Sequence, residues 1–178
     1  MLRQILDWVL LLKTNLKFTD DLAKELYKPV TRKFQRRRVN VNSIDEIWAA
    51  DLIDMQAFSK DNNGIKYLHT VIDVFSKFVW IDPLKRKTGQ DVANAYSRIL
   101  KEQRPIQMWV DRGCEFYNKD VRKQVELYST EIEDKSCVIE RYNRTINEKM
   151  FKYISANNTR KIVDVLDLLV DYYNNSIH

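Results

Sequence analysis

Apolar residues recur with helical spacing near the start of the chain. One such pattern covers residues 5–16, and a second, shorter one covers residues 22–26 and ends before Pro29. Apolar positions three and four residues apart form a stripe on one side of a helix, and proline cannot continue one. We therefore predict two short helices in this region.

The pattern changes between residues 47 and 81 to runs of β-branched and aromatic residues, which are typical of strands. The runs are Ile47–Met55, Tyr67–Val74 and Lys77–Ile81. Turn-forming residues at Asp61–Gly64 separate the first two runs, and Ser76 with Lys77 separates the second from the third. The pattern predicts an antiparallel meander of three strands.

Helical stripes alternate with short apolar runs from Thr88 onward. We predict a helix over Val92–Leu100, a buried strand over Ile106–Val110, and two short elements at Lys119–Gln124 and Val125–Tyr128. Two further helical stripes are formed by Ile139, Tyr142, Asn143, Ile146 and Met150, and by Ile162, Val165, Leu166, Leu169, Val170 and Tyr173. This order indicates an α/β fold with a mixed sheet of about five strands, antiparallel first and then parallel, flanked by helices.

Composition supports a single folded core. The chain has 178 residues, of which 44% are hydrophobic and 31% charged, which favours one globular domain with a small attachment. We place the short helices and a basic arm in residues 1–43 and the core in residues 44–178. The apolar run at residues 8–12 is too short to cross a membrane, so we expect an intracellular protein with no membrane partner. Two cysteines and two histidines do not make a zinc cluster.

The net charge of +5 is concentrated in one region. Six basic residues lie within an acid-free stretch, which leaves 24 basic against 25 acidic residues elsewhere. The six are Lys28, Arg32, Lys33, Arg36, Arg37 and Arg38. Such a cluster suits a phosphate backbone through counterion release, although a solvated charged surface is an equally natural interpretation. Arg36, Arg37 and Arg38 are our candidates for DNA contacts in the arm.

Three acidic residues follow apolar runs: Asp51, Asp111 and Glu140. A buried carboxylate is costly unless it pairs with a cation, accepts several hydrogen bonds or coordinates a metal ion. Hard divalent ions such as Mg²⁺ prefer carboxylate oxygens, so a metal site would explain all three acids together. Asp54 would point to the opposite face of its strand from Asp51, and Asp73 is equally suited to capping a turn.

The sequences around the three acids resemble the retroviral integrase superfamily, and most closely the integrases of Maverick/Polinton-type transposons. The matching blocks are Trp48–Asp51 with Thr70–Lys77, then Asp111–Phe116, then Val138–Thr145. The resemblance implies an RNase-H-like catalytic core of the DDE type with two Mg²⁺ or Mn²⁺ ions. Asp51 would bridge both ions, Asp111 would hold one and Glu140 the other, so the three carboxylates should converge. Gly113 would allow a tight turn after the strand.

The same resemblance implies a nucleotidyltransferase that processes DNA 3′ ends and joins them to target DNA. Its partners would be double-stranded DNA, both element ends and target, and further copies of the chain, and it would act in the nucleus. Arg144 lies four residues after Glu140 on one helical face, so it could reach a DNA phosphate, and Lys149 extends this basic character. Two alternatives stay open: a decayed or domesticated core that binds DNA or protein without catalysis, and a nuclease that only hydrolyses.

The interval between Asp111 and Glu140 is the main departure from that family. It contains 28 residues, roughly seven fewer than usual, which corresponds to about two helical turns. We expect the chain to fold and to have weak or no integrase activity.

Overall fold

The computed structural model describes residues 40–101, 103–111, 113, 115–123, 127–128 and 137–177. Contacts group residues 38–178 into one compact unit. The predicted N-terminal helices and the basic arm, including Arg36, Arg37 and Arg38, lie outside the described residues.

A five-stranded mixed sheet forms the centre of this unit, as predicted. Strands β1 (Ile47–Asp54), β2 (Tyr67–Asp73) and β3 (Val79–Leu84) form an antiparallel meander. Strand β4 (Gln107–Val110) pairs in parallel with β1, and β5 (Leu127–Tyr128) pairs in parallel with β4. The strand order is β3-β2-β1-β4-β5, so β1 lies in the middle of the sheet.

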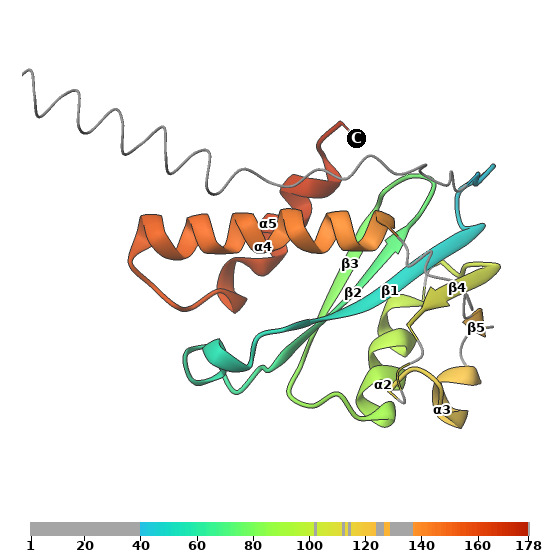
Figure 1. Ribbon diagram of the computed structural model, residues 1–178, viewed down its shortest axis with the longest axis horizontal. Helices are drawn as coiled ribbons and strands as arrows, with labels where there is room; N and C mark the ends of the chain where they lie inside the picture. Colours follow the sequence, from blue (N-terminus) through green and yellow to red (C-terminus); the bar gives the residue numbers. More distant parts are fainter. Residues whose placement is uncertain are drawn as a thin grey trace, which may run out of the picture. The chain divides into compact units, whose positions relative to one another are not determined.

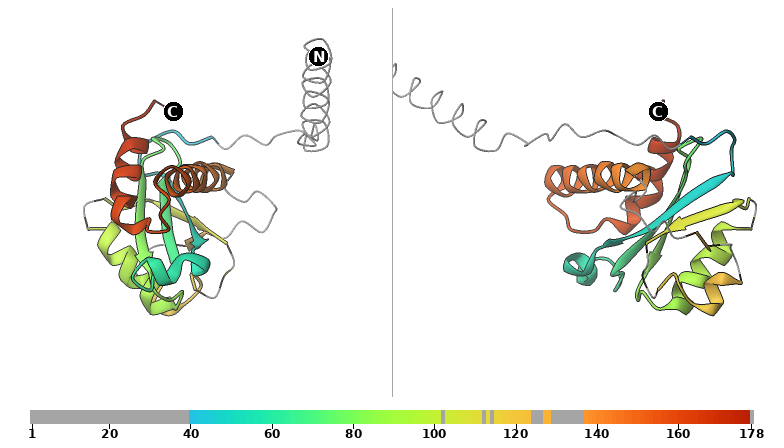
Figure 2. Two further views of the ribbon diagram at one scale, coloured as in Figure 1. Left: turned by 90° about the vertical axis from the view of Figure 1, so that its left-hand side faces the viewer. Right: turned by 45° about the vertical axis from the view of Figure 1, so that its right-hand side comes forward.

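Helices cover both faces of the sheet (Figure 1, and from two further sides in Figure 2). Helices α4 (Cys137–Asn157) and α5 (Leu166–Asn174), with the 3₁₀ turn η2 (Val163–Val165) before α5, pack on one face. Helix α2 (Gly89–Ile99) packs on the other, next to the single turn α3 (Lys119–Arg122). Within the described part of the chain, no helix is long and apolar enough to cross a membrane.

Alternation along β1 divides the core into two layers. Ile47, Ala49 and Ile53 are buried in the layer shared with α4 and α5, whereas Trp48 and Ala50 are buried in the layer shared with α2. Successive strand residues point to opposite faces, so Asp51 points to the α4 side. The position of this acid therefore follows from the alternation of its strand.

The turn between β2 and β3 is longer than the sequence pattern predicts. We expected the third strand to start at Lys77, but β3 starts at Val79. The Asp73 carboxylate accepts hydrogen bonds from the backbone N–H groups of Phe75 and Ser76 and from the Ser76 hydroxyl. Lys77 has a φ of 67°, and a residue in the left-handed region cannot continue a strand. Asp73 therefore caps this turn.

The connection from β1 to β2 contains a short 3₁₀ helix, η1 (Gln56–Asp61), where the sequence indicated only a turn. It ends at Asn62, which is fully buried. The Asn62 amide donates to the carbonyl oxygens of Phe58 and Arg160, each at 2.8 Å, and its Oδ1 accepts from the backbone of Ile162 at 2.6 Å and Val163 at 3.0 Å. One side chain thus ties this connection to the segment after α4.

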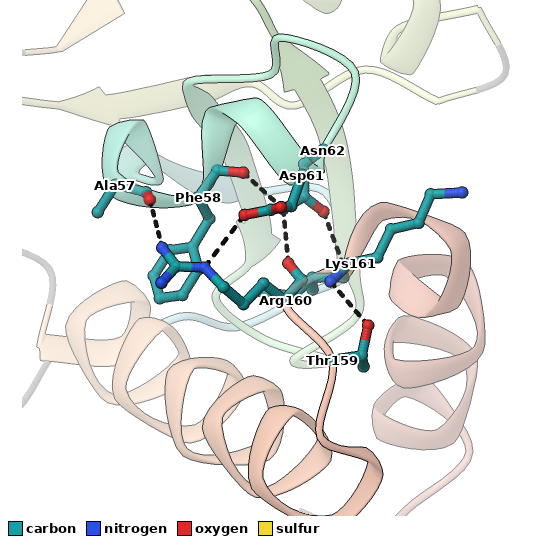
Figure 3. Close-up of polar contacts among 8 residues, drawn as sticks. Ala57, Phe58, Asp61, Asn62, Thr159, Arg160 and Lys161 are labelled. Atoms are coloured by element: carbon teal, nitrogen blue, oxygen red, sulfur yellow. Dashed lines mark hydrogen bonds and ion pairs between the residues drawn. The ribbon is translucent and has the colours of Figure 1, made fainter.

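Arg160 reinforces the same junction from outside (Figure 3). Its guanidinium lies 3.1 Å from the Asp61 carboxylate, donates to the Ala57 carbonyl at 2.7 Å, and lies 5.0 Å from the centre of the Phe58 ring. Because Arg160 is largely exposed, we attribute most of the junction's stability to the buried Asn62 bonds.

Candidate functional site

Parallel pairing brings the first two candidate acids side by side. Ala50 of β1 is the partner of Val110 of β4, so Asp51 and Asp111 are the next residues along two adjacent strands. Asp51 is half-buried, whereas Asp111 is exposed at the point where β4 ends. The two carboxyl groups therefore belong to the same central region of the sheet.

The carboxylate of Asp51 is held by a network that reaches α4. Oδ1 accepts from the Leu52 N–H at 2.8 Å, and Oδ2 accepts from the Asn143 side-chain amide at 2.8 Å. The Thr70 hydroxyl lies 3.0 Å from Asn143 Oδ1 and 3.2 Å from the Asp51 carbonyl oxygen. Thr70 is the β2 partner of Asp51 in the sheet. The network therefore connects Asp51 in β1 to Thr70 in β2 and to Asn143 in α4, the helix that carries Glu140.

Asp51 interacts electrostatically with both of the other acids. Burial raises the pKa of the Asp51 carboxyl above its usual range, and repulsion from Asp111 and, more weakly, from Glu140 adds to the rise. The hydrogen bonds from Leu52 and Asn143 oppose it because they stabilise the charged form. Both other acids are thus close enough to Asp51 to affect its ionisation.

Glu140 lies in the first turn of α4 and is exposed. It is three residues from Asn143, and residues three apart are neighbours on a helix. As the side chains are placed, no group of three or more His, Cys, Asp or Glu residues among those described could hold one metal ion. In this arrangement Asp111 and Glu140 each act on the charge of Asp51, and the three acids are not assembled around one point.

The chain after Asp111 turns tightly around Gly113. The Gly113 N–H donates to the Asp111 carbonyl, and the Gly113 carbonyl accepts from the N–H groups of Phe116 and Tyr117. A Cβ atom on Gly113 would lie 2.6 Å from the carboxyl carbon of Glu115. Among the described glycines only Gly64 has a left-handed φ, so the turn at Gly113 does not depend on an unusual backbone angle, and the Glu115 carboxyl is the movable end of a flexible side chain.

The two DNA-contact candidates on α4 lie on different sides of the helix. At about 100° per residue, Arg144 is about 40° from Glu140 around the axis, and Lys149 is about 180° away. The ammonium of Lys149 lies 4.2 Å from the centre of the Tyr172 ring in α5. The structure therefore places Arg144 on the Glu140 side of α4 and Lys149 against α5.

Asp54 is separate from the acidic group. It is exposed at the end of β1, and its carboxylate accepts hydrogen bonds from the backbone and side chain of Gln56. Its role is to cap the start of the β1–β2 connection.

Sequence reasoning missed Asn143 and Thr70 as parts of this site. The signal for Asn143 was a polar residue one turn after Glu140 in an otherwise apolar stripe. Thr70 begins a block that matches the integrases, but nothing local indicated a role in the site, because threonine is ordinary in a strand and its partners lie 19 and 73 residues away in the sequence.

The chain is similar in sequence to a transposon-derived protein of Caenorhabditis elegans whose function is uncharacterized. The identity is 37% over 131 residues, which cover 70% of this chain and 46% of that protein. The chain thus spans less than half of this relative's length. No protein-family model matches the chain.

Solved structures show the fold. A chain of the simian T-cell lymphotropic virus intasome, solved with PP2A regulatory subunit B56 gamma, matches 80% of this chain and 53% of its own length at 18% identity and a TM-score of 0.64. The HTLV-2 integrase catalytic core in complex with magnesium, in its dimeric form, matches 71% of this chain and 84% of its own length at 17% identity and a TM-score of 0.58. The fold is that of an RNase-H-like integrase core, and these likenesses do not single out the Maverick/Polinton type.

Proposed function

We propose that this chain is the catalytic core of an integrase-type polynucleotidyl transferase, with Asp51, Asp111 and Glu140 as its acidic site. The observation that supports this most is electrostatic: Asp111 and Glu140, from two other elements, both raise the pKa of Asp51. Repelling carboxylates destabilise an RNase-H-like core unless a cation offsets them.

The chemistry of this donor set fits divalent metal ions. Three carboxylates supply the hard oxygen atoms that Mg²⁺ and Mn²⁺ prefer. Asp51, Asp111 and Glu140 would together hold a pair of such ions. Such a pair of ions, when bound, would activate the attacking oxygen and stabilise the leaving one during phosphoryl transfer.

The chain's own residues would position these carboxylates and the DNA. Asn143 and Thr70 hold the Asp51 carboxylate toward α4 through the bonds described above. Arg144 is exposed, lies one turn from Glu140, and would bind a phosphate of the DNA backbone.

The structural relatives support the partners that this function requires. One solved relative is part of an intasome, and another is a dimeric integrase core in complex with magnesium. We propose double-stranded DNA, a second copy of the chain and Mg²⁺ or Mn²⁺ as partners here, with action in the nucleus.

A binding protein without turnover is the second candidate. It is favoured by the absence of an assembled three-acid ligand group among the described residues and by the 28-residue interval between Asp111 and Glu140. Both elements described in that interval are short, since α3 has four residues and β5 has two.

The test is an assay with labelled DNA duplex ends in Mg²⁺, in Mn²⁺ and in EDTA. An active core yields cut and strand-joined products that disappear in EDTA and in Asp51→Asn. Asp54→Asn is the matched control, because it removes a carboxylate from the same strand that lies outside the site, and it should retain activity. Cutting without joining would indicate a hydrolytic nuclease. DNA binding without either product would favour the second candidate and contradict the first.

A further inference from the structure

We infer that Asn118, pressed against Gly89, is a positioning residue that sets the course of the chain after Asp111. The functional part of this inference rests on the proposed role of Asp111 in the acidic site. The contact itself involves two residues that are far apart in sequence and outside the acidic group.

Asn118 has little freedom to move. Its Oδ1 accepts from the N–H groups of Asp120 and Val121, both at 3.0 Å, and caps α3. Its Nδ2 donates to the Glu115 carbonyl at 2.8 Å. Three hydrogen bonds therefore fix the side chain, so moving it aside would break at least one of them.

Gly89 is equally fixed because it is the first residue of α2. Thr88 is the N-cap of this helix, and its side chain accepts from the Asp91 N–H. A Cβ atom on Gly89 would lie 2.5 Å from Nδ2 and 2.7 Å from Cγ of Asn118, closer than non-bonded atoms can approach. The loop containing Asn118 can pack this closely on α2 only because residue 89 has no side chain.

A series of three backbone hydrogen bonds between residues close in sequence connects Asn118 to Asp111. The Asn118 N–H donates to the Phe116 carbonyl, Phe116 N–H donates to the Gly113 carbonyl, and Gly113 N–H donates to the Asp111 carbonyl. The Phe116 side chain is buried in the core layer beneath α2. A displacement of Asn118 is therefore transmitted through these bonds to Asp111, the residue that follows β4.

The direction of the Tm change caused by Gly89→Ala tests the contact. Gly89 does not have the left-handed φ that Gly64 has, so its backbone does not require glycine, and alanine is the better helix former. Without the Asn118 contact, Gly89→Ala should raise the Tm. With the contact, it should lower the Tm by about 2–4 °C, the scale expected for a modest loss of stability in a domain of this size.

The first experiment is a double-mutant cycle in thermal unfolding, with Gly89→Ala, Asn118→Ala and the double variant. We expect Gly89→Ala to lower the Tm in the natural chain and to leave it unchanged or raise it in the Asn118→Ala background, because the clashing atoms are then gone. Equal effects in both backgrounds would overturn the contact.

The second experiment measures Mn²⁺ affinity by calorimetry and separates positioning from general stability. We expect Gly89→Ala to weaken Mn²⁺ binding by about tenfold, as changes behind metal ligands commonly do. Gly64→Ala is the matched control: it strains a residue with a φ of 80° in the β1–β2 connection, so it should lower the Tm and leave the affinity unchanged. Equal affinity losses in both variants, or none in Gly89→Ala, would overturn the positioning role.

Asp111→Asn distinguishes this inference from the proposed function. If Asp111→Asn leaves Mn²⁺ binding unchanged, the proposed metal role of Asp111 fails, and the positioning role fails with it, while the Tm cycle still decides whether the contact exists. If Asp111→Asn weakens binding and Gly89→Ala does not, only the positioning inference fails.

Discussion

A buried histidine should make the fold sensitive to mild acid. His69 in β2 is fully buried, its ring centre lies 4.6 Å from that of Tyr96 and 6.1 Å from that of Phe116, and neither ring nitrogen has a hydrogen-bond partner among the described residues. Burial, together with the nearby Arg98 guanidinium, lowers the pKa of His69 from 6.5 to about 3. The folded protein therefore keeps this imidazole neutral.

The size of the decrease in the free energy of unfolding follows from proton linkage. The pKa of His69 is lower in the folded state than in the unfolded state, so its contribution to stability is complete above pH 6.5 and is lost as the pH falls toward 3. At pH 5 the unfolded state is stabilised by protonation, and the free energy of unfolding decreases by about 2 kcal/mol relative to high pH. This figure depends almost entirely on the unfolded pKa, because the folded state is essentially unprotonated at pH 5.

The assay is urea unfolding at pH 7.5 and at pH 5.0, for the natural chain and for His69→Leu. Leucine suits the apolar surroundings and has no titrating group, so the variant should lack this loss of about 2 kcal/mol. Comparing the two proteins cancels the contributions of all other titrating groups. A parallel loss of stability in both proteins would refute the linkage, since it would show that His69 does not titrate on unfolding.

Three further predictions concern other parts of the chain. Asn62→Ala should lower the free energy of unfolding by about 3 kcal/mol in urea titrations, because it leaves several buried backbone groups unpaired; a loss under about 1 kcal/mol would contradict this. Neutralising Arg36, Arg37 and Arg38 together should flatten the slope of log DNA affinity against log salt by about 2 to 3, and an unchanged slope would remove the arm from the DNA interface. Inserting about seven helix-forming residues after Gln124, roughly two helical turns, should raise strand-joining activity; equal, robust activity with and without the insertion would show that the short interval is harmless.

The order and type of the elements could be read from the sequence because each depends on local periodicity. Strands β1 and β2 are apolar runs buried on both faces of the sheet, and α4 buries residues at helical spacing, so the hydrophobic pattern located them. The three acids were also evident, since each follows an apolar run. Asp111 and Glu140 both raise the pKa of Asp51, whereas the assignment of the three acids to one catalytic, metal-binding site stays a prediction.

Tertiary structure decided the features that depend on partners distant in sequence. Asn62 bonds to residues about 100 positions away, Asn143 bonds to Asp51 across 92 positions, and Asn118 packs on Gly89. A short polar side chain has the same local propensity whether it ends a turn or joins two elements, so the sequence pattern did not distinguish these roles. Lys149 is a further example. Its charge is evident from the sequence, but its contact with the Tyr172 ring depends on the packing of α5 against α4.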